Sequence, residues 1–202
     1  MKMSKIKSNL LITFLCFLPV FCFAHPGHSE SIGFANGITH PLSGLDHFLV
    51  ILLVGFWSAF AFKKIWLGPI SFLTGMLFGS FAGLFIATNQ TLEFAISFSV
   101  LITGYLLITN RKTSDYLGQC LLALFGVFHG LAHTGYLPAL NEFNSYSVAM
   151  DLIGLVTGSA LLHVTGLIFA RKITSSIPWV TKLSGLATFF YGTLLLSQLA
   201  IN

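Results

Sequence analysis

Charged side chains are scarce in this sequence. Asp, Glu, Lys and Arg make up 8% of its 202 residues, whereas 55% are hydrophobic and 21 are Phe. Soluble globular domains have roughly 25% charged residues. This shortage excludes an ordinary water-soluble domain and predicts an all-α protein embedded in membrane lipid.

Motifs for nucleotide hydrolysis and for serine catalysis are absent as well. The sequence has no Gly-rich phosphate-binding loop and no serine nucleophile motif. Any transport by this chain would therefore use a gradient or a partner protein rather than its own ATP hydrolysis. The sequence also lacks a clustered basic face, so nucleic-acid binding is not expected.

The first 24 residues have the pattern of a secretory signal peptide. Lys2, Lys5 and Lys7 precede an apolar run over residues 10–21, and small residues stand at the −3 and −1 positions of a cleavage site after Ala24. An uncleaved first span is the alternative, although so short an apolar run is marginal for crossing a bilayer. Cleavage would leave seven basic and six acidic residues, so the mature chain would be nearly neutral.

Six apolar runs of membrane-spanning length follow the predicted signal peptide and fill most of the remaining chain. We therefore predict a bundle of six transmembrane helices over residues 45–202, preceded by an external, histidine-containing segment over residues 25–44. The six predicted spans are residues 45–62, 65–88, 91–109, 116–136, 146–170 and 179–200.

Basic pairs occur in alternate loops between these spans, at residues 63–64, 111–112 and 171–172. Loops rich in Lys and Arg usually lie on the cytoplasmic side of a membrane. The pattern predicts a multi-pass protein of the inner membrane with both mature termini on the external, periplasmic side.

The sequence FHGLAH, in the outer half of the fourth predicted span, contains His129 and His133. A spacing of four residues places both imidazoles on one face of a helix, where they can chelate one divalent metal ion. The alternative is that each histidine is a packed polar residue that hydrogen-bonds a neighbouring helix.

A second polar group stands in HPLSGLDH, at the outer end of the first predicted span. His47 can offer a neutral ring nitrogen, and Asp46 can bind a metal or orient a histidine of another helix. Pro41 suits the first turn of that span, where its missing N–H costs nothing. His40 then stands at the start of the helix, where it can reach the site or cap it.

Ionisable groups inside hydrocarbon cost about 2.5 to 3.5 kcal/mol each on insertion scales, so several at one level suggest a shared ligand. We therefore predict one metal site in the outer half of the membrane that joins the first span to the fourth. Imidazole with a little carboxylate favours Ni, Co, Zn or Cu(II) over Mg or Ca. The alternatives to transport are a catalytic Zn site of a membrane hydrolase and a non-transporting metallochaperone. An enzyme is not expected, because a hydrolase also needs a general base in reach of the water.

Small residues are expected where helices approach closely. Three glycines beside the two histidine groups are predicted to bring the first and fourth spans together: Gly44, Gly126 and Gly130. Three glycines of the second span are predicted to form a packing seam, within the bundle or between the protomers of a homo-oligomer: Gly75, Gly79 and Gly83.

His163 is predicted to lie past the membrane midplane. It follows Asp151 by twelve residues in the same span, so it lies about 18 Å deeper, too far to share an ion with the outer group. Three interpretations stay open: an inner waystation for the metal, a proton acceptor, or a helix-to-helix hydrogen bond.

The stretches HPLSGLDH, FHGLAH and ALLHVTG, with Glu93 opening the third span, resemble the HupE/UreJ family. This family of small membrane proteins is regarded as nickel or cobalt permeases associated with hydrogenase and urease maturation. The resemblance implies a metal route with two helper residues, Glu93 and His163; the route residues are His40, Asp46, His47, His129 and His133.

One departure from the family pattern affects the implied ligand set. Family members often carry a Gly after the last histidine of FHGLAH and an acid three residues after that histidine. Thr134 and Tyr136 occupy these positions here. The departure removes a carboxylate from the implied ligands, so a change in metal preference is expected.

Overall fold

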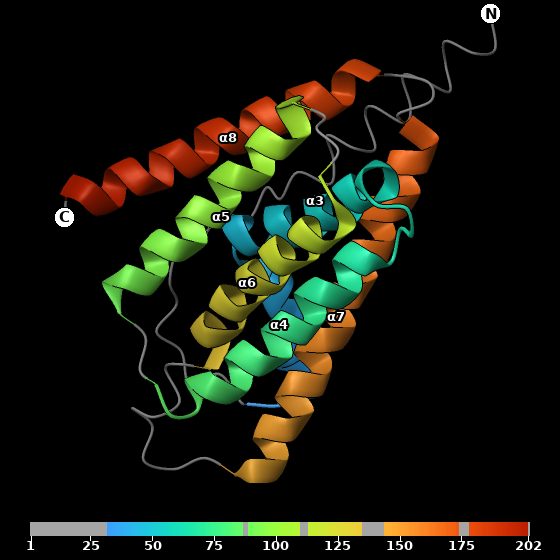
Figure 1. Cartoon of the computed structure of the whole chain (residues 1–202). Coiled ribbons are helices and arrows are strands. Elements are labelled where there is room, and N and C mark those ends of the chain that lie inside the picture. Colours follow the sequence, from blue (N-terminus) through green and yellow to red (C-terminus); the bar gives the residue numbers. More distant parts are fainter. Residues whose placement is uncertain (1–31, 87–88, 110–112, 135–143, 174–177, 202) are drawn as a thin grey trace, which may run out of the picture.

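The structure, a computed structural model, describes residues 32–86, 89–109, 113–134, 144–173 and 178–201, and the regular structure in these ranges is entirely helical. The predicted all-α fold is therefore confirmed for this part of the chain, whereas the predicted signal peptide lies outside it. The helices, drawn in Figure 1, are α2 (Phe34–Ser43), α3 (Leu45–Ala61), α4 (Leu67–Gly83), α5 (Gln90–Thr109), α6 (Asp115–Thr134), α7 (Ser145–Ile173) and α8 (Pro178–Ile201).

Four of these helices, α5 to α8, are long and apolar enough to cross a membrane. Helices α2 and α3 also qualify together as one broken span, with a bend of 88° between them. Helix α4 is apolar but has only 17 residues. The chain is thus a multi-pass membrane protein with four candidate spans, or five if the bent pair counts as one. Each of the six predicted spans coincides along the chain with one helix from α3 to α8.

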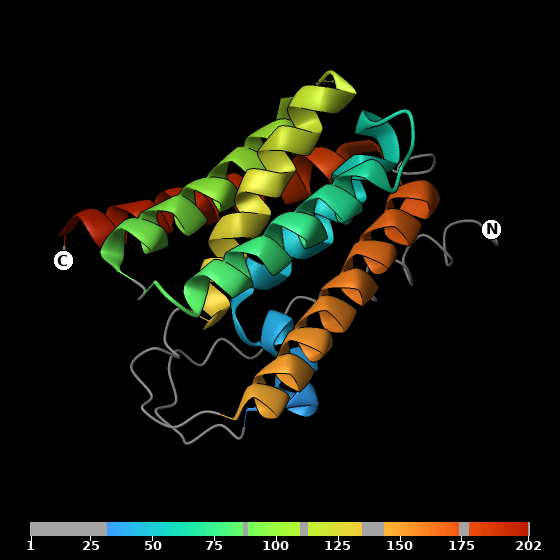
Figure 2. The same ribbon diagram turned by 60° about the horizontal axis from the view of Figure 1, so that its bottom comes forward.

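Helix α2 differs from the sequence-based expectation, which placed Pro41 in the first turn of the first span. Pro41 instead lies in the last turn of α2, which ends at Ser43. Proline has no N–H to continue a helix, and Gly44 follows in an extended conformation, with φ −109° and ψ 130°. The chain bends sharply at this glycine, so that α2 packs along the first half of α7 (Figure 2).

Two glycines of α6 determine which helix it contacts most closely. A side chain at Gly126 would collide with the backbone of Phe72, and one at Gly130 would collide with the backbone of Met76. Both partners belong to α4. The prediction that these glycines bring the first and fourth spans together is therefore wrong, because α4 occupies the close contact with α6.

The predicted glycine seam of α4 forms the other side of the same contact. Gly75 and Gly79 face the backbones of Ala123 and Val127 in α6, and a β-carbon at either glycine would collide with them. The seam lies within the bundle. An interface between protomers at these two glycines is therefore the wrong alternative, since α6 of the same chain already covers them.

Two further glycine contacts position polar residues of α7. Gly37 of α2 packs on the backbone of Asp151, and Gly55 of α3 packs on the backbone of His163. Asp151 and His163 thus lie at two levels of α7, where α2 packs on the first and α3 packs on the second.

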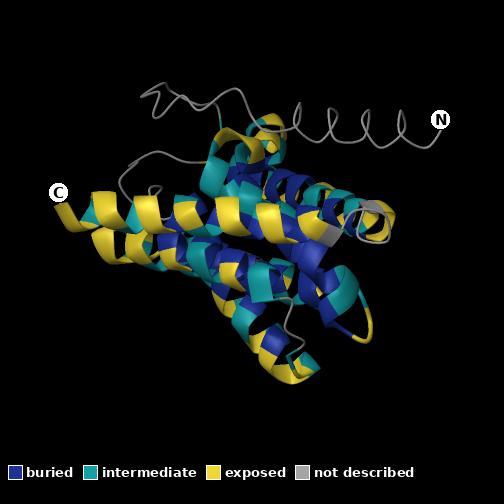
Figure 3. Cartoon of the chain, turned by 90° about the horizontal axis from the view of Figure 1, so that it is seen from above, coloured by how far each residue is buried: buried dark blue, intermediate teal, exposed yellow. Residues whose placement is uncertain are grey.

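Helices α5 and α8 pack along each other at one edge of the bundle, at the upper left in Figure 1. The visible side of α8, the helix that ends at the C-terminus, carries many exposed residues (Figure 3). Several of these are large and apolar, as expected for a surface that contacts lipid acyl chains: Leu183, Leu186, Phe190 and Leu194.

Candidate metal site

The bend between α2 and α3 brings the histidine at the end of one helix over the histidine at the start of the next. His40 lies in the last turn of α2, and Asp46 and His47 lie in the first turn of α3. The ring centroids of His40 and His47 are 5.9 Å apart. Both histidines are partly exposed, so the α2–α3 bend forms the accessible end of the site.

The two histidines of α6 lie against this pair. The ring centroids of His40 and His133 are 4.3 Å apart, and those of His47 and His129 are 4.7 Å apart. His129 and His133 are each only 1% exposed. The structure thus brings together the four histidines that the sequence singled out, and we call them the histidine row: His40, His47, His129 and His133.

His133 is held by a hydrogen-bonded chain that sequence reasoning did not assign to the site. Its Nε2 lies 2.7 Å from Oδ2 of Asp151, and Asn36 Nδ2 donates to Oδ1 of the same carboxylate over 3.2 Å. A carboxylate accepts hydrogen bonds, so in the neutral imidazole of His133 the hydrogen is on Nε2 and the lone pair is on Nδ1. Nδ1 is buried without a hydrogen-bond partner among the described residues.

The depth of Asp151 in its span could have shown this link. An acid in an apolar helix, at the level of two histidines of another helix, is expected to find a partner there. Asn36 had no comparable signal, because no helix was predicted in its segment.

Asp46 contacts the histidine beside it on its own helix, not a histidine of another helix. Nδ1 of His47 lies 3.2 Å from Oδ1 of Asp46. Nε2 of His47 is buried without a partner in the described part of the chain. Asp46 and Asp151 therefore have the same role: each holds one ring nitrogen of a histidine and leaves the other nitrogen of that ring unpaired.

His129 has no polar partner of this kind. Both of its ring nitrogens are buried and unpaired within the described ranges, and the ring of Phe72 lies 5.5 Å away between centroids. An unsatisfied buried polar group costs roughly 1–3 kcal/mol. The unpaired nitrogens of His47, His129 and His133 are thus costly to fold around and well suited to bind a cation.

The side chains do not converge on a single point. Among the residues that the structure describes, no three His, Cys, Asp or Glu groups are arranged as the ligands of one ion. The ring contacts instead connect the imidazoles in the order His133, His40, His47 and His129, with the two middle rings at the α2–α3 bend. Metal binding at these residues therefore stays a prediction, and it requires side-chain movement of the row.

Glu93 and Thr134 contribute at the edge of this arrangement. Glu93 is exposed in the first turn of α5, where its charge is near enough to act on His47, but it forms no hydrogen bond or ion pair with the row. Thr134, at the position where the resembled family often has Gly, donates from Oγ1 to the carbonyl of Ser80 over 2.5 Å. This bond joins the end of α6 to α4. Tyr136 lies outside the described residues.

His163 lies twelve residues beyond Asp151 along α7 and is 1% exposed. Its ring centroid is 5.2 Å from that of Phe72. The backbone of Ile51 lies close to the imidazole, but neither ring nitrogen makes a hydrogen bond of normal geometry in the described part of the chain. All three interpretations of His163 therefore stay predictions.

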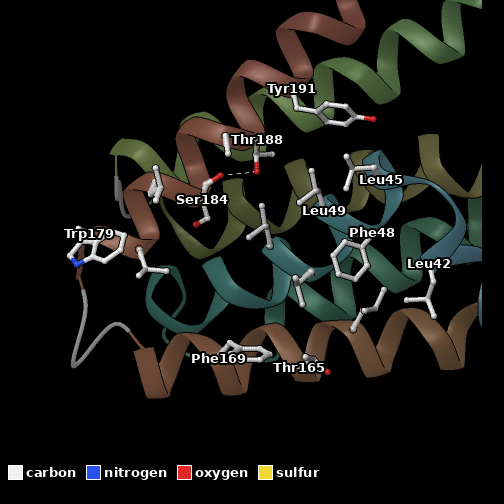
Figure 4. A pocket seen from close by; sticks show the side chains of 16 residues that line it. Leu42, Leu45, Phe48, Leu49, Thr165, Phe169, Trp179, Ser184, Thr188 and Tyr191 are labelled. Carbon is white, nitrogen blue, oxygen red and sulfur yellow. Dashed lines mark hydrogen bonds between the residues drawn. The ribbon is translucent and has the colours of Figure 1, made fainter. Parts of the chain in front are cut away.

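An apolar cavity of about 480 Å³ lies between α3, α7 and α8, apart from the histidine row (Figure 4). Its lining includes Leu49, Phe169 and Tyr191 but no histidine or acid. The hydroxyls of Ser184 and Thr188, also in the lining, bond carbonyls of their own helix. The cavity therefore offers no imidazole or carboxylate ligand to a metal ion.

Comparison with known proteins shows a match over most of the chain. The family model for HupE / UreJ protein matches residues 13–195. The chain is also similar to Protein HupE of Rhizobium leguminosarum bv. viciae, with 31% identity over 169 residues that cover 83% of each chain. No solved structure matches it.

Proposed function

The chain belongs to the HupE/UreJ family of membrane proteins, which is associated with nickel and cobalt transport, and on that premise we propose that it is an uptake permease or facilitator for Ni²⁺ or Co²⁺. The metal is its substrate, taken up through the histidine row and the carboxylates of Asp46 and Asp151. The observation that carries this proposal is the row itself: two buried histidines lie beside two partly exposed ones, and three of the four have buried ring nitrogens without a partner in the described part of the chain.

The donor chemistry supports a borderline transition metal. Neutral imidazole suits Ni, Co, Zn and Cu(II), whereas Mg and Ca prefer cages of oxygen atoms. The carboxylate that the family pattern supplies near the last histidine of FHGLAH is absent from this sequence. We infer that Asp151, which reaches His133 from α7, compensates for it. Because Asp151 hydrogen-bonds the imidazole of His133, it would orient that ligand and would not bind the metal ion itself.

The same geometry disfavours a metal-dependent hydrolase. A catalytic metal site needs a general base free to take a proton from bound water. Asp46 and Asp151 are each engaged with a histidine, and Glu93 is exposed at the start of α5 without contact to the row. These engagements support transport over catalysis.

Flux through purified protein distinguishes a permease from a metal-binding accessory protein. We expect proteoliposomes that contain this protein to accumulate Ni²⁺ or Co²⁺ in their lumen, with Mg²⁺ excluded, because imidazole ligands replace the water of a borderline ion. The measurement is fluorescence of a metal-sensitive dye trapped inside the vesicles. Metal bound to the protein without luminal accumulation would identify an accessory protein instead.

We further propose six membrane crossings in the inner membrane, with the signal peptide removed and both mature termini on the periplasmic side. The bent pair α2–α3 and helices α5 to α8 supply five crossings. Helix α4, at 1.5 Å per residue, is about 25 Å long, which a slightly thinned bilayer accommodates. Basic pairs at residues 63–64, 111–112 and 171–172 support this orientation.

A reporter fused after Asn202 tests this orientation. We expect alkaline phosphatase, which folds only outside the cytoplasm, to be active there, and green fluorescent protein exported by the same route to be dark. A control fusion after Lys64, in a loop predicted to be cytoplasmic, should give the opposite pair of results. A fluorescent C-terminal fusion with inactive phosphatase would refute the orientation and would place the histidine row on the cytoplasmic side.

A further inference from the structure

The histidine row continues past His129, but through a ring that has no nitrogen. The ring centroid of Phe72 is 5.5 Å from that of His129 and 5.2 Å from that of His163. No ring contact joins His129 and His163 directly in the described part of the chain. Phe72 is thus a phenyl ring that contacts two buried imidazoles, one from α6 and one from α7.

The position of Phe72 is tightly fixed. Its side chain is fully buried, with 0% exposure. Its carbonyl lies where a β-carbon of Gly126 would be, so its backbone is held against α6. One helical turn toward the outer end of α4, Met76 accepts a hydrogen bond from Ser159 of α7 at 3.6 Å. The ring can therefore leave this place only by rotation of its side chain, since the backbone cannot withdraw from α6.

We propose that Phe72 is a hydrophobic gate that separates the histidine row from His163. The proposal rests on the proposed function as a metal permease, and it names the residue that controls passage between an outer and an inner metal position. A phenyl ring offers no lone pair to a cation, and apolar constrictions in channels block ions by excluding water. A metal on His129 reaches His163 only when the phenyl ring rotates away.

The alternative is that Phe72 is an ordinary member of the apolar core, to which it does belong. The two roles differ in what the ring shields. A core residue stabilises the fold, and its loss leaves a cavity. A gate also keeps external ions from His163, so its loss exposes that position from the outside. Accessibility of position 163 therefore separates the two roles without any need for transport.

The experiment uses His163→Cys in a full-length protein whose native cysteines are replaced (Cys16→Ser, Cys22→Ser and Cys120→Ser). Spheroplasts are exposed briefly to Ag⁺ in chloride-free buffer and quenched. The protein is then unfolded, and unreacted thiol is alkylated with a polyethylene-glycol maleimide that shifts it on a gel. The rate at which Ag⁺ protects the thiol measures access from the outside.

With Phe72 present, we expect slow protection of the thiol at position 163. Phe72→Ala should speed it at least tenfold, whereas Phe72→Leu, which keeps most of the apolar volume, should leave it within about threefold. If Phe72→Ala does not fold, Phe72→Val replaces it. Its rate of thiol protection should lie between those of the wild-type residue and the alanine variant. Equal rates with Phe72 and with its small replacements would overturn the gate, as would fast protection when Phe72 is intact.

Flux in proteoliposomes, measured with His163 intact, keeps this test apart from that of the proposed function. The gate predicts faster Ni²⁺ entry with Phe72→Ala and slower entry with Phe72→Trp, whose larger ring leaves less readily. If the wild-type protein shows no flux but thiol access changes as predicted, the permease is refuted and Phe72 is still a barrier to external ions. Wild-type flux with thiol access insensitive to Phe72 would refute the gate alone.

Discussion

Cells that express the double variant His47→Ala, His133→Ala are expected to accumulate no more Ni²⁺ than cells without the protein. The two substitutions remove the unpaired Nε2 of His47 and Nδ1 of His133, one from α3 and one from α6. The remaining rings then lack their neighbours, because His40 loses its contact with His133 and His129 loses its contact with His47. The measurement is metal content by mass spectrometry after growth in low nickel, with at least a tenfold drop in the protein-dependent part.

The same variant should still fold, because alanine removes the cost of the unpaired ring nitrogens, and Asn36 keeps its hydrogen bond to the Asp151 carboxylate that loses His133. A size-exclusion profile and membrane abundance equal to those of the wild type establish this. Thr157→Ala is the matched control, since the Thr157 hydroxyl bonds only the carbonyl of Ile153 in its own helix. Full accumulation by a well-folded double variant would contradict the role of the row.

The second large effect is expected at Asp151. Asp151→Ala should weaken Ni²⁺ binding by roughly 10- to 100-fold, the usual effect of removing a partner that orients a metal-binding histidine. The cause is that Nε2 of His133 loses its acceptor at 2.7 Å, so neither the tautomer nor the orientation of the ring is fixed. The measurement is isothermal titration of purified protein with Ni²⁺.

A graded series tests this mechanism more sharply than one substitution. Asp151→Asn keeps an oxygen that accepts a hydrogen bond and should lose less affinity than Asp151→Ala. Asn36→Ala removes only the residue that holds the carboxylate, through the 3.2 Å bond, and should lose least. If all three variants bind like the wild type but melt at lower temperature, the chain from Asn36 to His133 is purely structural.

Local patterns in the sequence predicted the helices and the membership of the histidine row. Apolar runs predict the positions of α3 to α8 because each is a continuous stretch that must satisfy its own backbone in lipid. The four-residue spacing of His129 and His133 places them on one face of α6 for the same local reason. The bend that brings His40 over His47 was not predicted. A proline in the sequence does not show whether it stands in the first turn of one helix or in the last turn of the helix before it.

The choice of helix neighbours could not be predicted in the same way. Hydropathy shows that a helix is buried in a bundle, but it does not show which helix lies beside it. Gly126 was expected to face α3, and it faces Phe72 of α4 instead. The pairing of Asp151 with His133 and the contact of Phe72 with His163 both depend on this order of helices. These contacts link elements far apart in the chain, and no spacing in the sequence records them.

The most direct test of the histidine row is X-ray absorption at the nickel edge of purified protein loaded with one equivalent of Ni²⁺. The wild-type protein is predicted to show at least two imidazole ligands, identified by multiple scattering from their rings, as histidines of α3 and α6 move onto one ion. The double variant His47→Ala, His133→Ala should lose that scattering together with most of its affinity. A wild-type spectrum without imidazole, or a double variant that binds nickel with an unchanged spectrum, would contradict the assignment of these residues as the metal site.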